Sequence, residues 1–499
     1  MNRAETGHAG RRRAGVTRKG FLKFSVLAGV WVLLAVVYGF FGTYGNYRPY
    51  PPVNSHLADL GEGFLSGGLH LSKEPSRELL SLLDPYDPTA NAGLRYHDAS
   101  LYNGRFYLYF GPVPALVAVP WRLATGHWPP DVLLVCVFLA GAAIFQFLSL
   151  KKALSESGFG KNRYWLLIAG AALVFGAMGP ILASRAAIYE VEIAGASFFT
   201  SLALYSYFLF RKGRATRFLI TTAAFIVLAA GCRPHMMLVG LALLLLFTYK
   251  LLKKELEKTQ VALFATTLCV GAAALFYYNH ARFDEYFEFG IKYIMTCIHS
   301  GYNKFFPQSP GMAAKYLIMG LYYNFLSVPV LQASFPYVAP AVNRFAPFRE
   351  ISIYEVERAP RLLPENAPFY GYGIDATIGL VYVNPLFLAG PLLLFYRWKH
   401  ITDIKKREFL SALGVFLLFG VSTAATPLVF AGASTRYLAD FAPYLVLAGL
   451  YCALAALESG GGKLVEISTV LLVFWSVAVG MDLGFAGYYD LFKLNNPDL

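Results

Sequence analysis

Two carboxylates three residues apart give the first indication of chemistry in this sequence. Asp59 and Glu62 lie in the segment HLADLGEGFLSGGLHL, and on a helix their side chains would share one face. The apolar side chains that would then face lipid are Leu57, Leu60, Phe64 and Leu65, which predicts an amphipathic helix on a membrane surface. A carboxylate placed there could act as a general base, and the pair could hold a divalent metal ion. A solvated polar face of an interfacial helix would show the same spacing.

A second acidic and aromatic stretch follows. Asp84 and Asp87 lie in DPYDP, where Asp-Pro pairs are typical of turns. Asp98, Tyr102 and Arg105 lie in YHDASLYNGRFYLYFGPVPAL, where Asn-Gly indicates a hairpin turn flanked by aromatic residues. The aromatic residues suit either a membrane-interface belt or a platform for sugar rings. Asp98 is therefore a candidate catalytic residue, and Tyr102 and Arg105 are candidate substrate-binding residues.

Three further segments place charges at the ends of apolar helices: SRAAIYEVE, CRPHMM and STRYLADFAP. Their candidate substrate-binding residues are Arg185, Glu190, Arg233, His235, Arg436 and Asp440. Charged groups near membrane depth are costly and usually line a cavity or bind a partner. Arginine holds phosphate oxygens through a planar fork, so arginines converging on one external cleft would form a phosphate site at the lipid headgroups. The alternative is snorkelling and internal salt bridges, such as Arg185 with Glu190.

The elements that must position these residues are membrane helices. Of the 499 residues, 57% are hydrophobic and 15% are charged, and the mean hydropathy is +0.49. A soluble enzyme needs a larger charged share to cover its surface. Apolar runs recur that are long enough to cross roughly 30 Å of hydrocarbon. The composition therefore predicts an all-α integral membrane protein.

The apolar runs predict about eleven transmembrane helices. Those with both ends defined are expected near 21–41, 130–150, 163–184, 193–210, 261–279, 441–457 and 464–485. The fifth and sixth form one apolar run from Arg217 to Lys250 that is interrupted at 231–237, the eighth ends at Arg397, and the ninth follows Arg407. Lysines and arginines cluster at 3–19 and in the loops that would share the side of the N-terminus. Basic residues stay on the cytoplasmic side, so the N-terminus is predicted to be cytoplasmic and the C-terminus periplasmic, in a bacterial inner membrane.

The chain divides accordingly into tails, membrane segments and two long periplasmic loops. The expected divisions are a basic tail (1–20), a first helix (21–43), periplasmic loop 1 with interfacial helices (44–129), helices 2–7 (130–279), periplasmic loop 2 (280–374), helices 8–11 (375–485) and a periplasmic tail (486–499). Three prolines in FGPVPALVAVPWRL favour a membrane-parallel segment within loop 1.

Two other classes of function are disfavoured. The net charge of +13 could suggest a nucleic-acid partner, but the basic residues form short clusters between apolar runs instead of one face. The five cysteines form no CxxC pair, and most fall within apolar segments, which argues against a metal cage or a disulfide framework. No Walker loop or dinucleotide fingerprint is present.

With these parts in order, the chain resembles the GT-C superfamily of membrane glycosyltransferases, which includes protein O-mannosyltransferases and aminoarabinose transferases. The resemblance lies in one helix, a long outer loop with an early acidic residue, and an aromatic, Pro-rich segment entering a helical bundle. LYNGRFYLYFGPVPALVAVP, LAAGCRPHMMLVG, YYNHARFDEYFEFGIKY and TRYLADFAPYL carry it. The chain departs from the pattern in having Leu60 after Asp59, and in having Arg233 where many members carry Lys.

This resemblance implies an inverting transfer of a sugar from a polyprenyl-phosphate donor to a glycan, lipid or protein acceptor at the periplasmic face. Asp59 would be the base, and Glu62 would be a further catalytic residue or would share a metal ion with Asp59. Arg233, His235 and Arg436, with Arg185, would stabilise the leaving phosphate. The alternatives are a multi-pass transporter or lipid flippase, and an envelope-polymer ligase that uses a similar donor.

Overall fold

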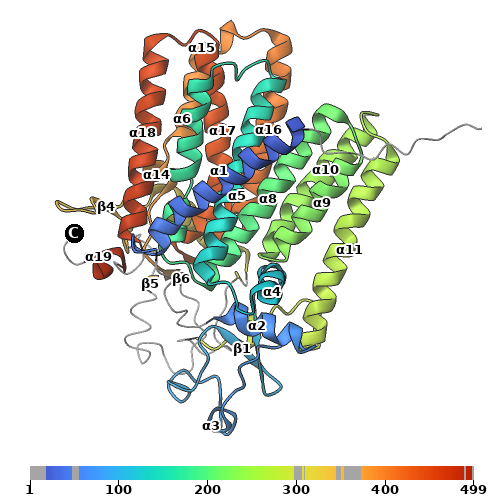
Figure 1. Cartoon of the computed structure of the whole chain (residues 1–499), viewed down its shortest axis with the longest axis vertical. Coiled ribbons are helices and arrows are strands. Elements are labelled where there is room, and N and C mark those ends of the chain that lie inside the picture. The colour runs from blue at the N-terminus through green and yellow to red at the C-terminus, as the bar shows by residue number, and fades with distance from the viewer. Residues whose placement is uncertain are drawn as a thin grey trace, which may run out of the picture.

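A computed structural model of the chain describes residues 18–47, 55–296, 306–307, 309–343, 350–352, 372–487 and 491–496. Most of them belong to long helices, which run side by side in a bundle above a smaller lobe of short elements (Figure 1). Most of the basic tail and parts of the predicted second loop lie outside the described residues. The protein is a multi-pass membrane protein, because the described residues include nine helices long and apolar enough to cross a bilayer.

The bundle is built from eleven segments that correspond to the eleven predicted ones. They are α1 (Arg18–Gly42), α5 (Asp131–Glu156), α6 (Arg163–Phe175) with α7 (Gly179–Ala183), α8 (Ile188–Gly213), α9 (Arg217–Ala230), α10 (Met237–Leu252), α11 (Lys258–Phe283), α15 (Leu386–Arg397), α16 (Asp403–Val429), α17 (Leu438–Glu458) and α18 (Gly462–Ala486). The count of eleven spans is not confirmed, since α9 has 14 residues and α15 has 12, too few to cross a bilayer alone.

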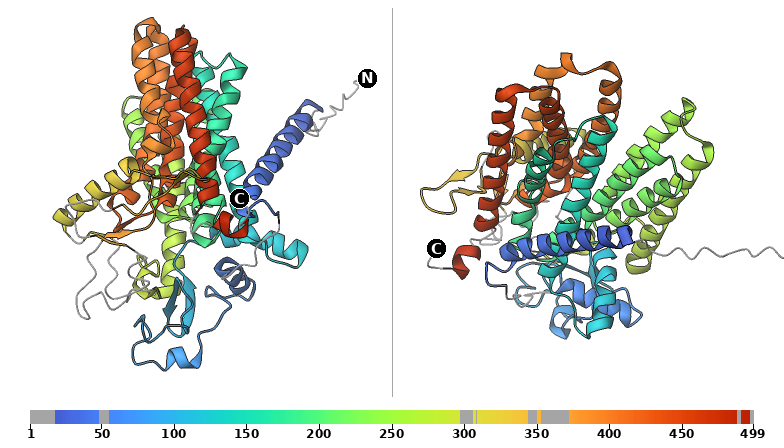
Figure 2. Two further views of the ribbon diagram at one scale, coloured as in Figure 1. Left: turned by 90° about the vertical axis from the view of Figure 1, so that its left-hand side faces the viewer. Right: turned by 45° about the horizontal axis from the view of Figure 1, so that its top comes forward.

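Burial divides these helices into a centre and a periphery. In α17, 94% of the apolar stretch is buried, and α15 and α16 pack against it. The first helix, α1, lies across the flank of α5, and only 17% of its apolar stretch is buried (Figure 2). A helix with exposed Val26, Val32 and Leu33 on its outer face is solvated by lipid.

The remaining elements are short. They are α2 (His56–Leu65), α3 (Arg77–Leu80), β1 (Ala99–Tyr102), β2 (Arg105–Leu108), α4 (Val113–Thr125), the 3₁₀ turns η1 (Pro234–Met236), η2 (Ile291–Tyr293), η6 (Trp398–His400) and η7 (Thr435–Tyr437), α12 (Pro310–Leu321), the π-turn η4 (Tyr322–Leu326), β3 (Val330–Leu331), β4 (Val338–Ala339), β5 (Glu350–Ser352), β6 (Tyr372–Ile374), α14 (Leu380–Val383), β7 (Gly432–Ala433) and α19 (Leu491–Asn495). Those of residues 56–125 form most of the lobe.

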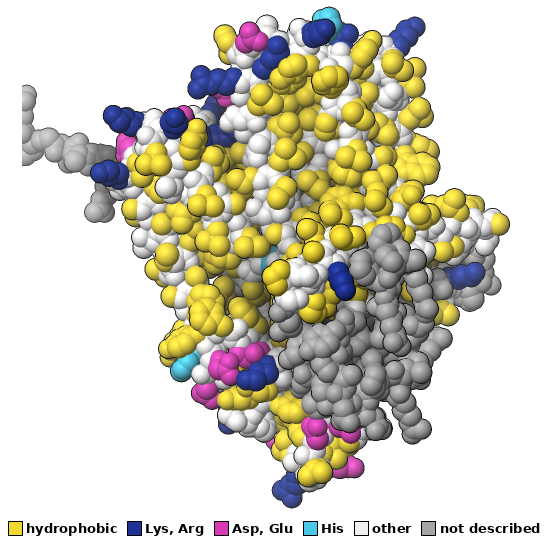
Figure 3. Space-filling view, turned by 180° about the vertical axis from the view of Figure 1, so that it is seen from behind, with side chains coloured by type: hydrophobic (Ala, Val, Ile, Leu, Met, Phe, Trp, Pro, Cys, Tyr) yellow, Lys and Arg dark blue, Asp and Glu magenta, His cyan; other side chains and the backbone are white. Residues whose placement is uncertain are grey.

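The two ends of the bundle differ in charge. The basic end comprises the loops at 151–163, 211–217, 250–258 and 397–407, which carry the lysine and arginine clusters. The loop end is opposite and comprises the lobe, residues 184–188, 231–236 and 430–437, and the start of α17. Figure 3 shows a broad apolar band with lysines and arginines along its upper edge, at the basic end. The charge asymmetry predicted from the sequence is therefore a property of the folded bundle.

Candidate functional site

The predicted carboxylate helix is α2, which begins at the loop end. Ser55 caps it by accepting a hydrogen bond from the Ala58 N–H, and Asp59 lies in the first turn, where a negative charge is favourable. The prediction that its apolar side chains face lipid is wrong for Leu57 and Leu60, which are buried in the core, whereas Leu65 is exposed. The helix packs on α4 and β2, and these elements cover its apolar face. Asp59 is thereby turned away from the core and is only partly buried.

Both carboxylate oxygens of Asp59 accept hydrogen bonds. The Ser72 hydroxyl donates to Oδ1 at 2.8 Å, and the Tyr96 hydroxyl donates to Oδ2 at 2.8 Å. Tyr96 is held in turn by His56, whose ring stacks on it with centroids 4.1 Å apart. Burial raises the pKa of Tyr96 well above its usual range, as do the charge of Asp59 and its hydrogen bond and, less strongly, the charge of Asp131. Tyr96 therefore stays a donor and orients Asp59.

Glu62 has a different environment from Asp59. Its Oε2 accepts a hydrogen bond from Trp128 Nε1 at 2.9 Å and lies 3.5 Å from Arg122 Nε. These contacts join α2 to the last turn of α4 and to the loop that follows it, which supports a structural role. Within the described residues, no group of three or more His, Cys, Asp or Glu side chains is arranged to hold a metal ion.

The Asn-Gly hairpin forms as predicted, but Tyr102 beside its turn contacts the end of α11 and not the other candidate residues. β1 and β2 pair antiparallel with Tyr102 opposite Arg105, and Asn103 and Gly104 have the positive φ angles of 46° and 71° that such a turn requires. The Tyr102 hydroxyl donates to Asp284 at 2.9 Å, and its ring contacts Phe283 at the end of α11. Arg105 is exposed. The structure therefore does not bring Tyr102 and Arg105 to the other candidate residues.

The CRPHMM and STRYLADFAP segments do meet. Arg233, just before η1, donates from Nη2 to Asp440 Oδ2 at 2.9 Å, and His235 Nε2 lies 3.6 Å from the same oxygen. Asp440 is 1% exposed and lies in the first turn of α17, and the Arg233 and His235 side chains are also largely buried. Two buried nitrogens, Arg233 Nε and His235 Nε2, have no hydrogen-bond partner among the described residues. Buried donors and acceptors of this kind are uncommon and are satisfied in most proteins by ordered water or a ligand.

A second arginine of the same cluster comes from η7. Arg436 Nη1 lies 4.0 Å from Glu190 and 3.8 Å from Asp375. Arg185 Nη1 lies 4.0 Å from the same Glu190 oxygen, so the predicted Arg185–Glu190 contact is present at the edge of ion-pair distance. The Tyr189 ring contacts both arginines, with its centroid 4.6 Å from the Arg436 guanidinium and 5.6 Å from that of Arg185. Such cation–π contacts hold guanidinium planes in place.

Asp375 reaches this cluster through a small parallel sheet. β6 pairs with both β5 and β7, and the Asp375 N–H donates to the Ala433 carbonyl. Its Oδ2 accepts from Ser434 at 3.0 Å. The sequence reasoning missed Asp375, because it follows a strand of three residues with no helical charge pattern around it. Its position after Gly373 in the run GYGIDATIG was the only local signal.

Tyr109 lies within electrostatic range of the predicted Asp98 and of two arginines. Desolvation raises the pKa of Tyr109 well above its usual range, the charges of Asp98 and Tyr437 raise it further, and the charges of Arg436 and Arg233 lower it. Asp98 itself has a left-handed backbone, with φ of 61°, and lies 3.5 Å from His97. The charges of Asp98, Arg233 and Arg436 therefore all affect the pKa of Tyr109, a residue that the sequence reasoning did not single out.

Glu192 lies deeper in the bundle, on α8, two residues after Glu190. It is fully buried, and neither of its oxygens has a hydrogen-bond partner within the described part of the chain. Asp131, at the start of α5, is also buried. The site is therefore a cluster of arginines at the end of the bundle that carries α2. The carboxylates around these arginines outnumber the guanidinium groups. The charge of Asp131 also raises the pKa of Tyr96, which donates to Asp59.

Comparisons with known proteins give similarity of layout at low sequence identity. No protein-family model matches the sequence, and no curated protein matches it significantly. The chain aligns with ArnT from Cupriavidus metallidurans, solved bound to undecaprenyl phosphate, over 95% of this chain and 79% of that one, with 13% identity and a TM-score of 0.43.

Two structures of an oligosaccharyltransferase from Archaeoglobus fulgidus also align. One is AglB in complex with an inhibitory peptide and a dolichol-phosphate, with 12% identity and a TM-score of 0.44. The other is the apo form, with 11% identity and a TM-score of 0.46. Both cover 94% of this chain, which spans 56% and 57% of their lengths. These similarities concern the fold alone.

Proposed function

We propose that the chain is a membrane glycosyltransferase that moves a sugar from a polyprenyl-phosphate donor to an acceptor at the loop end, which would face the periplasm. The observation that carries this proposal is the pair of buried nitrogens, Arg233 Nε and His235 Nε2, which have no hydrogen-bond partner among the described residues and lie beside Asp440. A phosphate oxygen would accept from such donors, and arginine suits it because the guanidinium offers two parallel N–H groups.

The position of the cluster suits a donor that is anchored in lipid. Arg185, Arg233 and Arg436 lie where α8, α10 and α17 begin, at the end of apolar segments. A lipid phosphate sits at this level of a bilayer while its chain remains in the hydrocarbon. Charged groups at such depth are costly, so a cluster of them supports a role in binding.

The reaction we propose is a single displacement. The acceptor hydroxyl oxygen attacks the anomeric carbon of the donor sugar while Asp59 takes the hydroxyl proton. The bond between that carbon and the phosphate oxygen breaks, and its electron pair leaves on the lipid phosphate. Attack opposite the leaving group inverts the anomeric centre. Arg233 and Arg436 stabilise the negative charge that grows on the phosphate. In a preorganised site we expect this electrostatic stabilisation to contribute more to the rate than the proton transfer does.

The test uses two neighbouring carboxylates on one helix. Asp59→Asn should reduce sugar transfer in reconstituted membranes by at least about a hundredfold, as expected for loss of a general base. Glu62→Gln is the matched control, because it makes the same change one turn away and leaves the Trp128 contact possible. Equal activity of Asp59→Asn and the wild-type protein would remove Asp59 as the base, and equal loss in both variants would indicate a structural effect of α2.

A further inference from the structure

Residues 310–343 form a ledge at the side of the bundle. The ledge consists of α12, η4 and the antiparallel hairpin of β3 with β4, and β4 projects beyond α18 (Figure 1). Lys315 is the only charged residue in this stretch of sequence, and residues 316–343 contain no Asp, Glu, Lys, Arg or His. Water-soluble segments are far richer in charge, since about a quarter of the residues of a typical soluble domain are charged.

The ledge exposes large apolar side chains along its whole length. Leu331 of β3 is the most exposed of them, at 74%. Others come from α12, from η4 and from the hairpin, among them Leu317, Ile318, Leu326, Val330 and Tyr337. A continuous apolar surface on a segment without charge is typical of a surface that contacts lipid or another protein.

The first attachment of the ledge is at the loop end of α16. The backbone of α12 contacts that of α16 directly at Gly320, where an added Cβ would overlap with the Leu428 carbonyl oxygen. Leu428 is the last residue but one of α16, which begins at the basic end. The start of the ledge is therefore level with the loop end of a membrane helix.

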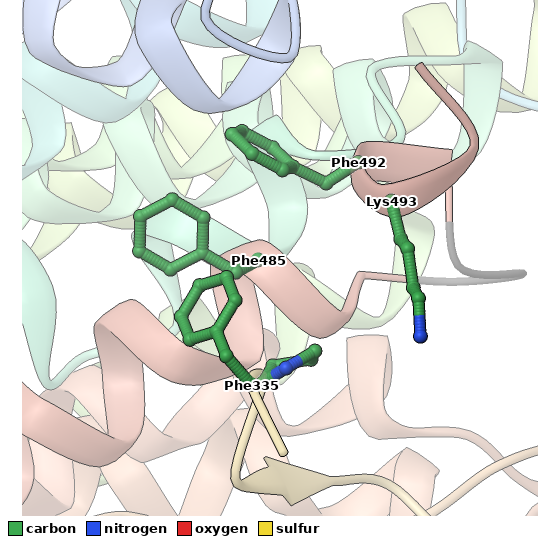
Figure 4. A pocket seen from close by; sticks show the side chains of 5 residues that line it. Phe335, Phe485, Phe492 and Lys493 are labelled. Atoms are coloured by element: carbon green, nitrogen blue, oxygen red, sulfur yellow. The ribbon is translucent and has the colours of Figure 1, made fainter. Parts of the chain in front are cut away.

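The second attachment is at the loop end of α18. The Val338 N–H donates a hydrogen bond to the Asp482 carboxylate. The Phe335 ring packs on Phe485, with centroids 4.9 Å apart, and Phe485 also packs on Phe492 of α19 (Figure 4). Because the two attachments lie at the same end of two different membrane helices, they fix the level of the ledge relative to the bundle.

The length of α18 gives the depth of this level in a bilayer. Lys463 and Glu466 are exposed at the basic end of α18, and Asp482 is the next charged residue along the helix. At 1.5 Å per residue, Asp482 lies roughly 24–29 Å farther along the axis than these two residues. The hydrocarbon of a bilayer is roughly 30 Å thick. The charges of α18 therefore lie near the two faces of the hydrocarbon, and the hairpin lies at the face on the loop side.

The helix that carries the hairpin is itself surrounded by lipid. On α18, Leu471 and Phe474 are 61% and 70% exposed, within three turns of Asp482. Exposed apolar side chains on a membrane helix contact acyl chains. The ledge extends this lipid-facing surface sideways, so lipid is the occupant that continues an interface already present.

The ledge fits the boundary between hydrocarbon and headgroups better than either layer beside it. Hydrocarbon would leave the free N–H and C=O groups at the edges of a two-stranded hairpin without partners. Water would contact its apolar side chains at a cost in free energy. At the boundary, water reaches the backbone and acyl chains reach the side chains. Tyrosines are enriched at this level, and residues 316–337 contain four of them.

We propose that the ledge lies in the interface of the bilayer leaflet at the loop end, with its apolar side chains against the outer parts of the acyl chains. Part of the predicted periplasmic loop 2 (280–374) then belongs to the membrane-bound part of the protein. The proposal rests on the exposure and depth of the ledge and does not depend on the proposed function.

The experiment places one fluorescent unnatural amino acid at Leu331 in the full chain, in nanodiscs with one copy each. Phosphatidylcholine with brominated acyl chains quenches from the lipid side, and iodide quenches from water. Two other exposed leucines are the matched positions: Leu471 on α18 faces lipid, and Leu83, in the lobe, is fully exposed. The brominated chains should quench the probe at Leu331 at least half as strongly as at Leu471, and iodide should quench it less than half as strongly as at Leu83.

Both other outcomes would overturn the proposal. Quenching at Leu331 like that at Leu83, by iodide and not by brominated chains, would mean that the ledge lies in water. Protection of Leu331 from both quenchers would mean that protein covers it. Since each nanodisc holds one copy, that protein would be another part of the same chain and not a second molecule.

Discussion

At the scale of single residues, the orientation of Asp59 depends on Tyr96. The phenol donates to Oδ2 at 2.8 Å, and its own pKa is raised so that it remains protonated. Tyr96→Phe removes this donor but keeps the ring that stacks on His56. Because a hydrogen bond to a charged group contributes about 1.5–3 kcal/mol, we expect kcat to fall by roughly tenfold or more with KM for the donor unchanged.

Steady-state kinetics of Tyr96→Phe beside Ser72→Ala checks this expectation, since Ser72 donates to the other oxygen. Both variants should lower kcat, and neither should change thermal stability by much, because Asp59 remains partly exposed. If Tyr96→Phe changed KM alone, the phenol would contact the donor instead of positioning the carboxylate.

A second prediction separates stability from activity at the Arg233–Asp440 pair. Asp440→Leu alone leaves Arg233 uncompensated in a buried place and should destabilise the protein by about 3–5 kcal/mol. The double change Arg233→Met with Asp440→Leu replaces both partners by apolar groups and should recover most of that stability. Thermal unfolding in detergent measures both effects.

The same double variant should remain without sugar transfer, because the guanidinium that would hold the phosphate is lost. Recovery of both stability and activity would show that the pair is only structural.

At this scale the sequence predicted Arg233, His235, Arg436 and Asp440 together, since charge beside an apolar helix is conspicuous. It missed Tyr96, Tyr109 and Asp375, which are ordinary turn and strand residues until distant segments meet around them.

At the scale of elements, α4 is held against the end of α9 by a close backbone contact. A Cβ added at Gly111 would lie 1.9 Å from the Gly231 carbonyl oxygen, and the Val113 N–H donates to that same oxygen at 3.0 Å. Gly111→Ala must therefore push α4 away from the segment that carries Arg233. We expect lower thermal stability and at least about tenfold lower activity, as a small displacement of positioned groups is costly.

The matched control is Gly414→Ala in α16, where an added Cβ would meet nothing within 4 Å. It should stabilise the protein by up to about 1 kcal/mol and leave activity unchanged, since alanine is the better helix former. Normal activity in Gly111→Ala would show that the α4–α9 contact does not position the arginine. Sequence alone could not identify this contact, because a glycine before a proline also suits a simple turn.

Hydrophobic runs predicted the position of every long helix but not which runs are full spans. The runs ending at Ala230 and Arg397 are as apolar as their neighbours, yet α9 and α15 have only 14 and 12 residues. Gly231 and Arg233 end the first, and Asn384 and Pro385 precede the second. Periodicity likewise predicted that α2 is amphipathic, but which surface covers its leucines depends on α4, a separate element.

At the scale of the whole molecule, the two ends have separate chemistry. The basic end holds mostly exposed lysines and arginines, some of them in ion pairs such as Lys250 with Glu255. Arg211, between Glu156 and Glu408, is largely buried. The loop end holds arginines that are buried among carboxylates. Exposed basic loops determine orientation in a membrane, whereas buried arginines at helix ends indicate binding. The composition of the loops predicts the orientation in the membrane, but only the fold shows which arginines are buried.

This asymmetry predicts the orientation of the chain in the cell. Asn103 is exposed at the tip of the hairpin and Lys254 is exposed in the loop between α10 and α11, at opposite ends of the bundle. In intact spheroplasts, Asn103→Cys should react with a membrane-impermeant maleimide and Lys254→Cys should react only after lysis. Reaction of Lys254→Cys in intact cells would place the arginine cluster on the cytoplasmic side, where its donor would have to be a lipid of the inner leaflet.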